Sequence, residues 1–233
     1  LTMSIESGNA FIRDHIVTRD MTEGDMRFSF RHAQKLGIPT FANTILGIPG
    51  PVIPDVGAGD FEARLKAIAH DARQYGVKRG GQPFDLWKTV EASRPLYEDP
   101  RVWRQLIRHF LRTLSLHDDQ LGYDTESCEF NLDLNVSFGE FPILHPYPRT
   151  AATEWLMRKG WFDGDFDKLH GSYQNRSPLP CFTEREKIVQ QNLALLATFC
   201  MLFTGSKHRW LRAFGKPVGH VCLHWLSHVP YRW

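Results

Sequence analysis

The most constraining feature of the sequence is a strand, helix and strand pattern within its first 46 residues. Residues 1–5 (Leu-Thr-Met-Ser-Ile) are apolar and β-prone, and residues 38–46 form a second apolar run that is bounded by glycines. Between them, Thr22 with Asp25 three positions later is typical of a helix N-cap, and Gly37 is typical of a helix end. Such units pair their strands in parallel through a right-handed crossover. We therefore predict an α/β fold built around a parallel sheet.

The rest of the chain predicts one more strand and a series of helices. Apolar and polar residues alternate over residues 130–138, so we expect the third strand there. Periodicity, caps and breakers predict helices at about residues 10–17, 22–36, 60–75, 84–98, 100–116, 150–159 and 183–203, and in the tail. Three parallel strands bring their carboxyl ends to one edge of the sheet, where α/β proteins bind ligands.

The composition favours a soluble, cytoplasmic protein without a nucleic-acid or membrane partner. Lys and Arg (28) nearly balance Asp and Glu (26), so the formal net charge of +2 gives no general attraction to phosphates or anionic lipids. No apolar stretch reaches the ~20 residues that a membrane-spanning helix needs. The amino end also lacks the basic and apolar segments of a secretory leader.

Two groups of metal-ligating residue types are present, and neither makes a complete site. The four cysteines, Cys128, Cys181, Cys200 and Cys222, are scattered without CxxC spacing. Their even number allows disulfides, but a chain of this size does not depend on them, so we expect reduced structural thiols. In the tail, His220, His224 and His228 recur at helical spacing and could ligate a metal, but no acidic partner stands nearby in the sequence. The alternative is a terminal amphipathic helix that docks on the body of the protein. We expect no metal ligand in this chain.

Polar and flexible residues follow each predicted strand. Glu6, Ser7 and Asn9 follow the first strand, residues 47–50 (Gly-Ile-Pro-Gly) follow the second, and a loop with His145 and Tyr147 follows the third. Polar side chains there could bind hydroxyl groups, and the glycines could let a flat ring approach the backbone. The alternative is that the glycines and prolines only make turns.

Four blocks in this order carry a family resemblance: Ile5-Glu-Ser-Gly-Asn9, Arg19 ahead of Thr22, residues 36–50 (LGIPTFANTILGIPG), and residues 145–150 (HPYPRT). Together they resemble the carboxyl half of a radical S-adenosylmethionine enzyme, and most closely the group with an N-terminal cobalamin (B12)-binding domain. The resemblance covers roughly residues 1–50 and 130–200. Two positions depart from the family pattern: Pro51 replaces the usual acidic residue, and Arg149 replaces the usual glycine.

The resemblance implies the carboxyl half of a partial (β/α)6 TIM-like barrel, in which the three strands would be strands four, five and six, with one strand edge left unpaired. We expect this domain over residues 1–160, with the crossover helix at 84–91, helical insertions near 52–83 and 99–129, and a mostly helical carboxyl-terminal extension over 161–233. The first residue is not methionine, so we expect the chain to be the carboxyl part of a longer polypeptide, or a processed or partial sequence. The cysteines that ligate a [4Fe–4S] cluster (CxxxCxxC) would then lie upstream of Leu1.

The resemblance also implies a set of residues that bind S-adenosylmethionine. Glu6 and Ser7 match positions that contact the ribose and the methionyl part, and Arg19 matches a partner of the carboxylate. Ile45, between Asn43 and Gly47, matches the residue that packs on the adenine, and the loop near Tyr147 would close over the same ring. The cofactor presents a carboxylate, cationic groups, hydroxyls and a purine, so these residue types suit it. Taken singly, Arg19 could equally be a solvated surface cation and Ile45 a core residue.

Two functions of different class remain. In the first, a reduced cluster in the missing amino-terminal half cleaves S-adenosylmethionine to a 5′-deoxyadenosyl radical for C–H activation or cobalamin-dependent methyl transfer. The substrate, a small molecule or a peptide, is not identified, whether cobalamin is bound stays open, and this chain alone should be inactive and bind the cofactor weakly or not at all. In the second, the chain is a non-catalytic half-barrel remnant or interaction module.

Overall fold

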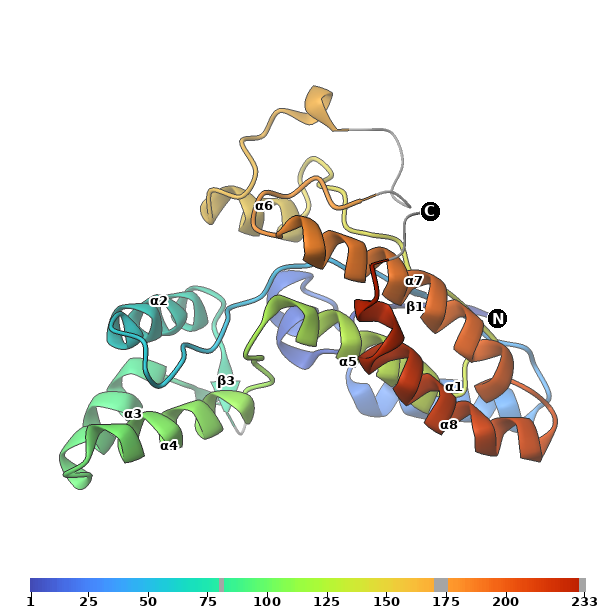
Figure 1. Ribbon diagram of the computed structural model, residues 1–233, viewed down its shortest axis with the longest axis horizontal. Coiled ribbons are helices and arrows are strands. Elements are labelled where there is room, and N and C mark those ends of the chain that lie inside the picture. Colours follow the sequence, from blue (N-terminus) through green and yellow to red (C-terminus); the bar gives the residue numbers. More distant parts are fainter. Residues whose placement is uncertain (80–81, 170–175, 231–233) are drawn as a thin grey trace. The chain divides into compact units, whose positions relative to one another are not determined.

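The computed structural model describes residues 1–79, 82–169 and 176–230, and the chain forms two compact units. The first unit comprises Leu1–Pro49 and Leu121–Trp233, and the second comprises Gly50–Gln120 (Figure 1). The first unit holds the sheet and every residue that we expected to bind a cofactor.

The first unit is built on a small parallel sheet. Its strands β1 (Thr2–Glu6), β2 (Phe41–Thr44) and β5 (Phe138–Glu140) lie in the order β1-β2-β5, and both pairs are parallel. The predicted α/β class with a parallel sheet is therefore confirmed. Asn43 on β2 is aligned with Ser4 on β1 and with Glu140 on β5, so these three polar residues form a row across the sheet.

The third strand does not lie where the alternation predicted it. Most of residues 130–138 belong to the end of helix α5 (Gln120–Asp133) and the turn after it, and β5 begins only at Phe138. The alternation was misleading because α5 buries neighbouring apolar and polar residues together, such as Phe130, Asn131 and Leu132. A helix that is buried on more than one side loses the periodic stripe that identifies it.

Most of the other helices were predicted correctly, because local capping signals start them. Thr22 and Asp25 form the expected capping box of α1, and Thr183 and Glu186 form that of α7. The described residues of the first unit also form the π-helical turn η1 (Ile12–Ile16) and the helices α1 (Glu23–Lys35), α6 (Ala151–Arg158), α7 (Glu184–Thr204) and α8 (Arg209–His224). Short 3-10 turns occur at η3 (Phe166–Lys168) and η4 (Leu226–His228).

The core of the first unit lies on one face of the sheet. Ala42 and Leu46 on that face are fully buried, and Leu193 and Met201 of α7 pack in the same cluster with residues of α1, α5 and α8. Gly139 on β5 allows this approach, because a Cβ there would collide with the side chain of Met201. The segment that we expected as a carboxyl-terminal extension, 161–233, thus contributes its helices to the core of the sheet unit.

Helix α7 is the one described helix whose length and apolarity would allow it to cross a membrane. In the structure 44% of its apolar window is buried, and its residues Val189, Leu193 and Ala197 belong to the core cluster. One side of α7 therefore packs in the core, whereas Leu195, Phe199 and Leu202 on the helix are exposed.

The second unit is a helical unit with its own core. It contains α2 (Phe61–Gln74), α3 (Leu86–Ser93), η2 (Arg94–Leu96), α4 (Pro100–Arg112) and a two-stranded antiparallel ribbon of β3 (Lys78–Arg79) and β4 (Gln82–Pro83). The rings of Phe61 and Trp103 pack edge to face with centroids 6.0 Å apart. We expected two insertions around a crossover helix at 84–91, but residues 50–120 form one unit that includes this helix. The helix that precedes β5 is α5.

The four thiols are free, and burial raises the pKa values of three of them. Burial raises the pKa of Cys128 well above its usual value and raises the pKa values of Cys181 and Cys200 to about 12. With a pKa near 12, roughly one thiol in ten thousand is ionised at pH 8, and the thiolate is the reactive form. We expect Ellman's reagent to react with these three thiols slowly in the native protein and quickly in guanidinium chloride. Rapid titration of all four thiols in the native protein would contradict this burial.

Candidate functional site

A cavity of about 470 Å³ lies at the carboxyl ends of the three parallel strands. The polar row Ser4, Asn43 and Glu140 lines it, and Glu6 and Ile45 line it just beyond the ends of β1 and β2. Val17 and Ile48 also line it, and the loop after β5 and the start of α6 contribute Pro142, Ile143, Leu144, His145, Tyr147, Thr150, Ala151 and Ala152. We call this the strand-end cavity. It opens on the sheet face that carries Asn43 and Ile45, opposite the face that carries Ala42 and Leu46.

Glu6 is held at the cavity by an unusual backbone conformation. Its φ angle is 63°, and the register between β1 and β2 shifts between Ser4 and Glu6. The Ser4 hydroxyl donates a hydrogen bond of 2.6 Å to Glu6 Oε1. The left-handed region costs a residue with a Cβ about 1 kcal/mol or more, and such strain is concentrated at functional sites. The carboxylate is thus fixed beside the polar row.

The loop after β5 is fastened to the end of β2. Leu46 N donates to Pro142 O at 2.9 Å, and Leu144 N donates to Leu46 O at 2.7 Å. His145 is buried against the cavity, whereas Tyr147 is 59% exposed. Arg149, at the position where the resemblance predicts glycine, has a φ of 64°, a conformation that glycine adopts without strain. The loop therefore keeps the backbone geometry of a glycine position.

Ser7 and Gly47 do not line the strand-end cavity but fasten helices to the strand ends. The Ser7 hydroxyl lies 3.0 Å from that of Ser127 on α5. Gly47 N donates to the buried carboxylate of Asp124 at 2.7 Å, and Gln190 on α7 donates to the same carboxylate at 3.1 Å. These two residues, expected to contact a cofactor, are thus occupied in positioning the strand ends.

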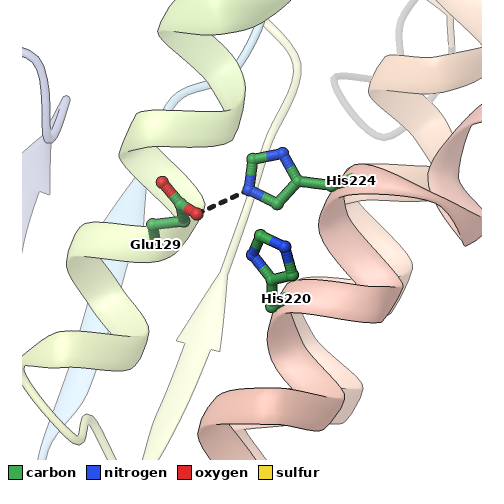
Figure 2. A group of neighbouring side chains, drawn as sticks. All are labelled: Glu129, His220 and His224. Atoms are coloured by element: carbon green, nitrogen blue, oxygen red, sulfur yellow. Dashed lines mark hydrogen bonds and ion pairs between the residues drawn. The ribbon is translucent and has the colours of Figure 1, made fainter.

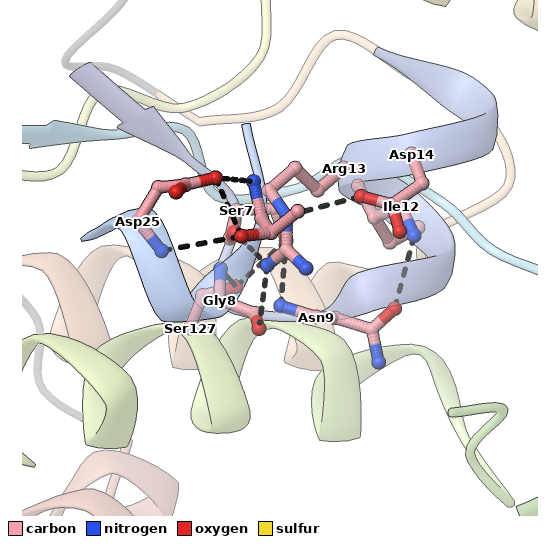
Figure 3. A network of polar contacts seen from close by, with 9 residues as sticks. Ser7, Gly8, Asn9, Ile12, Arg13, Asp14, Asp25 and Ser127 are labelled. Carbon is pink, nitrogen blue, oxygen red and sulfur yellow. Dashed lines mark hydrogen bonds and ion pairs between the residues drawn. The ribbon is translucent and has the colours of Figure 1, made fainter. Parts of the chain in front are cut away.

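A polar network organises the turn after β1 (Figure 3). Arg13 is buried, and its Nη1 donates to the carbonyl oxygens of Ser7 and Gly8 at 3.4 Å each while its Nε donates to Asp14 at 3.1 Å. Asn9 Oδ1 accepts a hydrogen bond from Ile12 N at 3.0 Å. Sequence reasoning missed Arg13 and Asp124, because an isolated Arg or Asp in the sequence looks like a surface charge.

Arg19 lies apart from the strand-end cavity. It lines a second hollow of about 390 Å³ on the segment that joins η1 to α1, together with Asp20 and Thr22. Its Nε is buried and has no hydrogen-bond partner among the described residues. The same hollow also carries the acidic side chains of Asp14 and Glu23. The Nε atoms of Arg104 and Arg108 in the second unit are unpartnered in the same way, so this feature does not by itself mark Arg19 as an anion site.

The histidines of the tail meet an acidic residue that the sequence did not reveal. His220 and His224 lie on α8, and Glu129 of α5 reaches them from another part of the chain. Helix α8 ends at His224, so His228 falls in η4 and outside this group. The expectation that all three histidines share one helical face is therefore wrong for His228.

A scan against protein-family models and searches of curated proteins and of solved structures find no match for this chain. The functional argument therefore rests on the residues of the site.

Proposed function

We propose that this chain is the carboxyl half of the barrel of a radical S-adenosylmethionine enzyme, and that its strand-end cavity binds S-adenosylmethionine. One observation carries the proposal: Glu6, Asn43, Ile45 and Tyr147 line one cavity at the carboxyl ends of three parallel strands. These residues come from sequence blocks that are distant in the chain. Their convergence is what a shared ligand requires.

The lining of the strand-end cavity suits the cofactor's adenosyl part. Its volume of about 470 Å³ falls within the range of small-molecule sites. The carboxylates of Glu6 and Glu140 can accept hydrogen bonds from ribose hydroxyls and favour the cationic sulfonium and ammonium groups. Ile45 and Leu144 offer an apolar wall for the adenine. Arg19 is the candidate partner of the cofactor's carboxylate from the resemblance alone, since the hollow that it lines shares no residue with the strand-end cavity.

The sheet also supports the barrel proposal. β1 is an edge strand, and the sheet face opposite the helices carries Phe41 and Phe138, whose rings stack with centroids 5.3 Å apart. Phe138 is 46% exposed there. In a closed barrel this face would be the filled interior, and the edge of β1 would pair with a further strand. We therefore assign β1, β2 and β5 to strands four, five and six of a (β/α)6 barrel.

The proposal divides the chemistry between the cofactors and this chain. Bound S-adenosylmethionine and a reduced [4Fe–4S] cluster supply the radical chemistry for C–H activation or, with cobalamin, methyl transfer. The residues of this chain bind and orient the cofactor and exclude water from it. The cluster ligands would come from the amino-terminal half of a longer polypeptide.

The cavity can be tested on this chain by NMR with S-adenosylmethionine as the probe. We expect weak binding, with a dissociation constant on the order of 1 mM, because the cluster that would hold the methionyl group is missing. Chemical-shift changes should be confined to residues near 4–6, 43–48 and 140–152. Ile45→Lys should remove them by placing a charge on the apolar wall, whereas the matched exposed change Leu195→Lys on α7 should not. Unchanged binding in Ile45→Lys would overturn the site.

The enzyme proposal is tested on the longer polypeptide. A CxxxCxxC segment should lie within roughly one hundred residues upstream, the length of the other half of such a barrel. In the reconstituted protein, Arg19→Ala should remove a charge-assisted pair and weaken cofactor affinity about ten- to hundredfold in a calorimetric titration. Unchanged affinity would contradict the role of Arg19. Absence of the cysteine segment would favour the non-catalytic half-barrel module instead.

A further inference from the structure

Three metal-ligating side chains converge on the surface of the first unit, away from the strand-end cavity. Glu129 lies on α5, and His220 and His224 lie one turn apart on α8 (Figure 2). One ligand atom from each side chain lies within 4.8 Å of the other two. His224 Nε2 is 2.6 Å from Glu129 Oε1, and the two imidazole centroids are 4.5 Å apart.

The two helices hold this group in a fixed frame. Lys216 of α8 forms an ion pair of 3.2 Å with Asp133 at the end of α5. One turn further along α8 lies Gly219. Gly219 leaves room for Leu132, because a Cβ there would lie 2.7 Å from Leu132 Cδ1. His224, further along α8, contacts Glu129, which lies earlier on α5. The contacts therefore advance along α8 as they go back along α5. α8 therefore lies antiparallel to α5 along this seam.

The rotation of α8 about its axis is also fixed. Cys222 and Leu223, which lie between the two histidines in sequence, are buried in the core cluster. The histidines consequently point to the opposite, exposed side of the helix, toward Glu129. The side chains of the two helices already meet in the folded chain, which brings the three ligands together before a metal arrives.

We propose that Glu129, His220 and His224 bind a divalent transition-metal ion of the Zn²⁺ type, with water in the remaining coordination position. Two imidazoles and one carboxylate are a ligand set that zinc accepts in tetrahedral sites open to solvent. At metal–ligand distances near 2.1 Å, tetrahedral ligand atoms stand about 3.4 Å apart, so small side-chain rotations complete the site. Mg²⁺ and Ca²⁺ prefer oxygen ligands and do not suit two imidazoles. The metal would join α8 to α5.

The test is a Zn²⁺ titration of the 233-residue chain in competition with a chromophoric chelator. We expect one equivalent of tightly bound Zn²⁺ that excess Mg²⁺ does not displace, and a higher unfolding temperature with Zn²⁺ than without it. Each of His220→Ala, His224→Ala and Glu129→Gln should weaken Zn²⁺ binding at least about tenfold, since even the loss of an outer partner of a metal ligand costs that much. The matched control is His228→Ala, an exposed tail histidine outside the group, which should leave the affinity unchanged.

Two further measurements keep the result interpretable. Without metal, His220→Ala should unfold at the wild-type temperature, whereas His224→Ala and Glu129→Gln also alter the contact between His224 and Glu129 and are compared with and without Zn²⁺. His220→Ala is the cleanest, because the described residues give the His220 ring no hydrogen-bond partner. Substitution by Co²⁺ should give a spectrum without thiolate-to-cobalt charge transfer, since no cysteine belongs to the group. Wild-type affinity in all three variants, or a thiolate band, would overturn the assignment.

Discussion

Replacing Trp155 by alanine is expected to lower the free energy of unfolding by about 3–5 kcal/mol, the usual cost of deleting a large buried aromatic side chain. Trp155 is only 1% exposed, and its indole Nε1 donates a hydrogen bond of 2.7 Å to Pro49 O. Trp161 packs against it edge to face with centroids 6.0 Å apart. The residue therefore fastens α6 to the loop after β2, next to the cavity residue Ile48. Denaturant unfolding followed by tryptophan fluorescence and circular dichroism measures the change.

Two further variants distinguish the loss of buried volume from the loss of the hydrogen bond and from the removal of an exposed indole. Trp155→Phe keeps much of the volume but leaves Pro49 O without its donor, so it should cost less than the alanine variant. Trp210→Ala removes an indole that is 62% exposed on α8 and should change stability by less than about 0.5 kcal/mol. Equal losses in Trp155→Ala and Trp210→Ala would contradict the packing of α6 described above.

The sequence allows a prediction of those elements that residues close together in the chain determine. The capping boxes at Thr22 and Thr183 and the N-cap Thr150 set helix starts within a few residues, whatever the helices pack against. The first two strands were visible because a strand, helix and strand unit has both its strands in one short stretch of sequence.

The third strand was not predictable, because tertiary contacts decide it. β5 has three residues, too few for a periodic signal, and its pairing with β2 joins residues almost one hundred positions apart. The preceding helix carries Asp124, Ser127 and Asn131 on its buried side, where they bind Gly47, Gly8 and Thr44. Because α5 buries polar side chains as well as apolar ones, its sequence shows neither the apolar stripe of an amphipathic helix nor the polar composition of a loop.

In the candidate sites, too, local sequence predicts some residues, whereas others are brought together only by tertiary contacts. That Glu6, Asn43 and Ile45 would meet follows from parallel strands ending at one edge, which the sequence indicates. The acid beside His224 could not be found in this way, since Glu129 is distant in sequence and reaches α8 only through the packing of two helices. The placement of Arg19 outside the strand-end cavity depends on the turn at η1, a π-helical segment that no sequence signal marks.

The turn after β1 gives the second large effect. Gly8→Ala is expected to destabilise the protein by about 1–3 kcal/mol, because overpacking a tight contact forces the backbone apart. A Cβ at Gly8 would lie 2.7 Å from Phe130 Cβ and 2.8 Å from Ser127 Cα on α5. Neither atom is the end of a flexible side chain, so α5 must move away from the strand. The same movement would stretch the bonds that Gly8 makes to Ser127 Oγ and to Arg13.

A second glycine variant distinguishes this clash from a general effect of the substitution. Gly24→Ala lies in the exposed first turn of α1, where the new Cβ would meet only Thr22 Oγ1 at 3.6 Å among the described residues. It should be neutral or stabilise the protein by about 0.5 kcal/mol, since alanine restricts the unfolded chain and favours helix. Both variants are compared by urea unfolding at one temperature. If Gly8→Ala were as stable as Gly24→Ala, α5 could not lie as close to the turn after β1 as the contacts of Gly8 with Ser127 and Phe130 require.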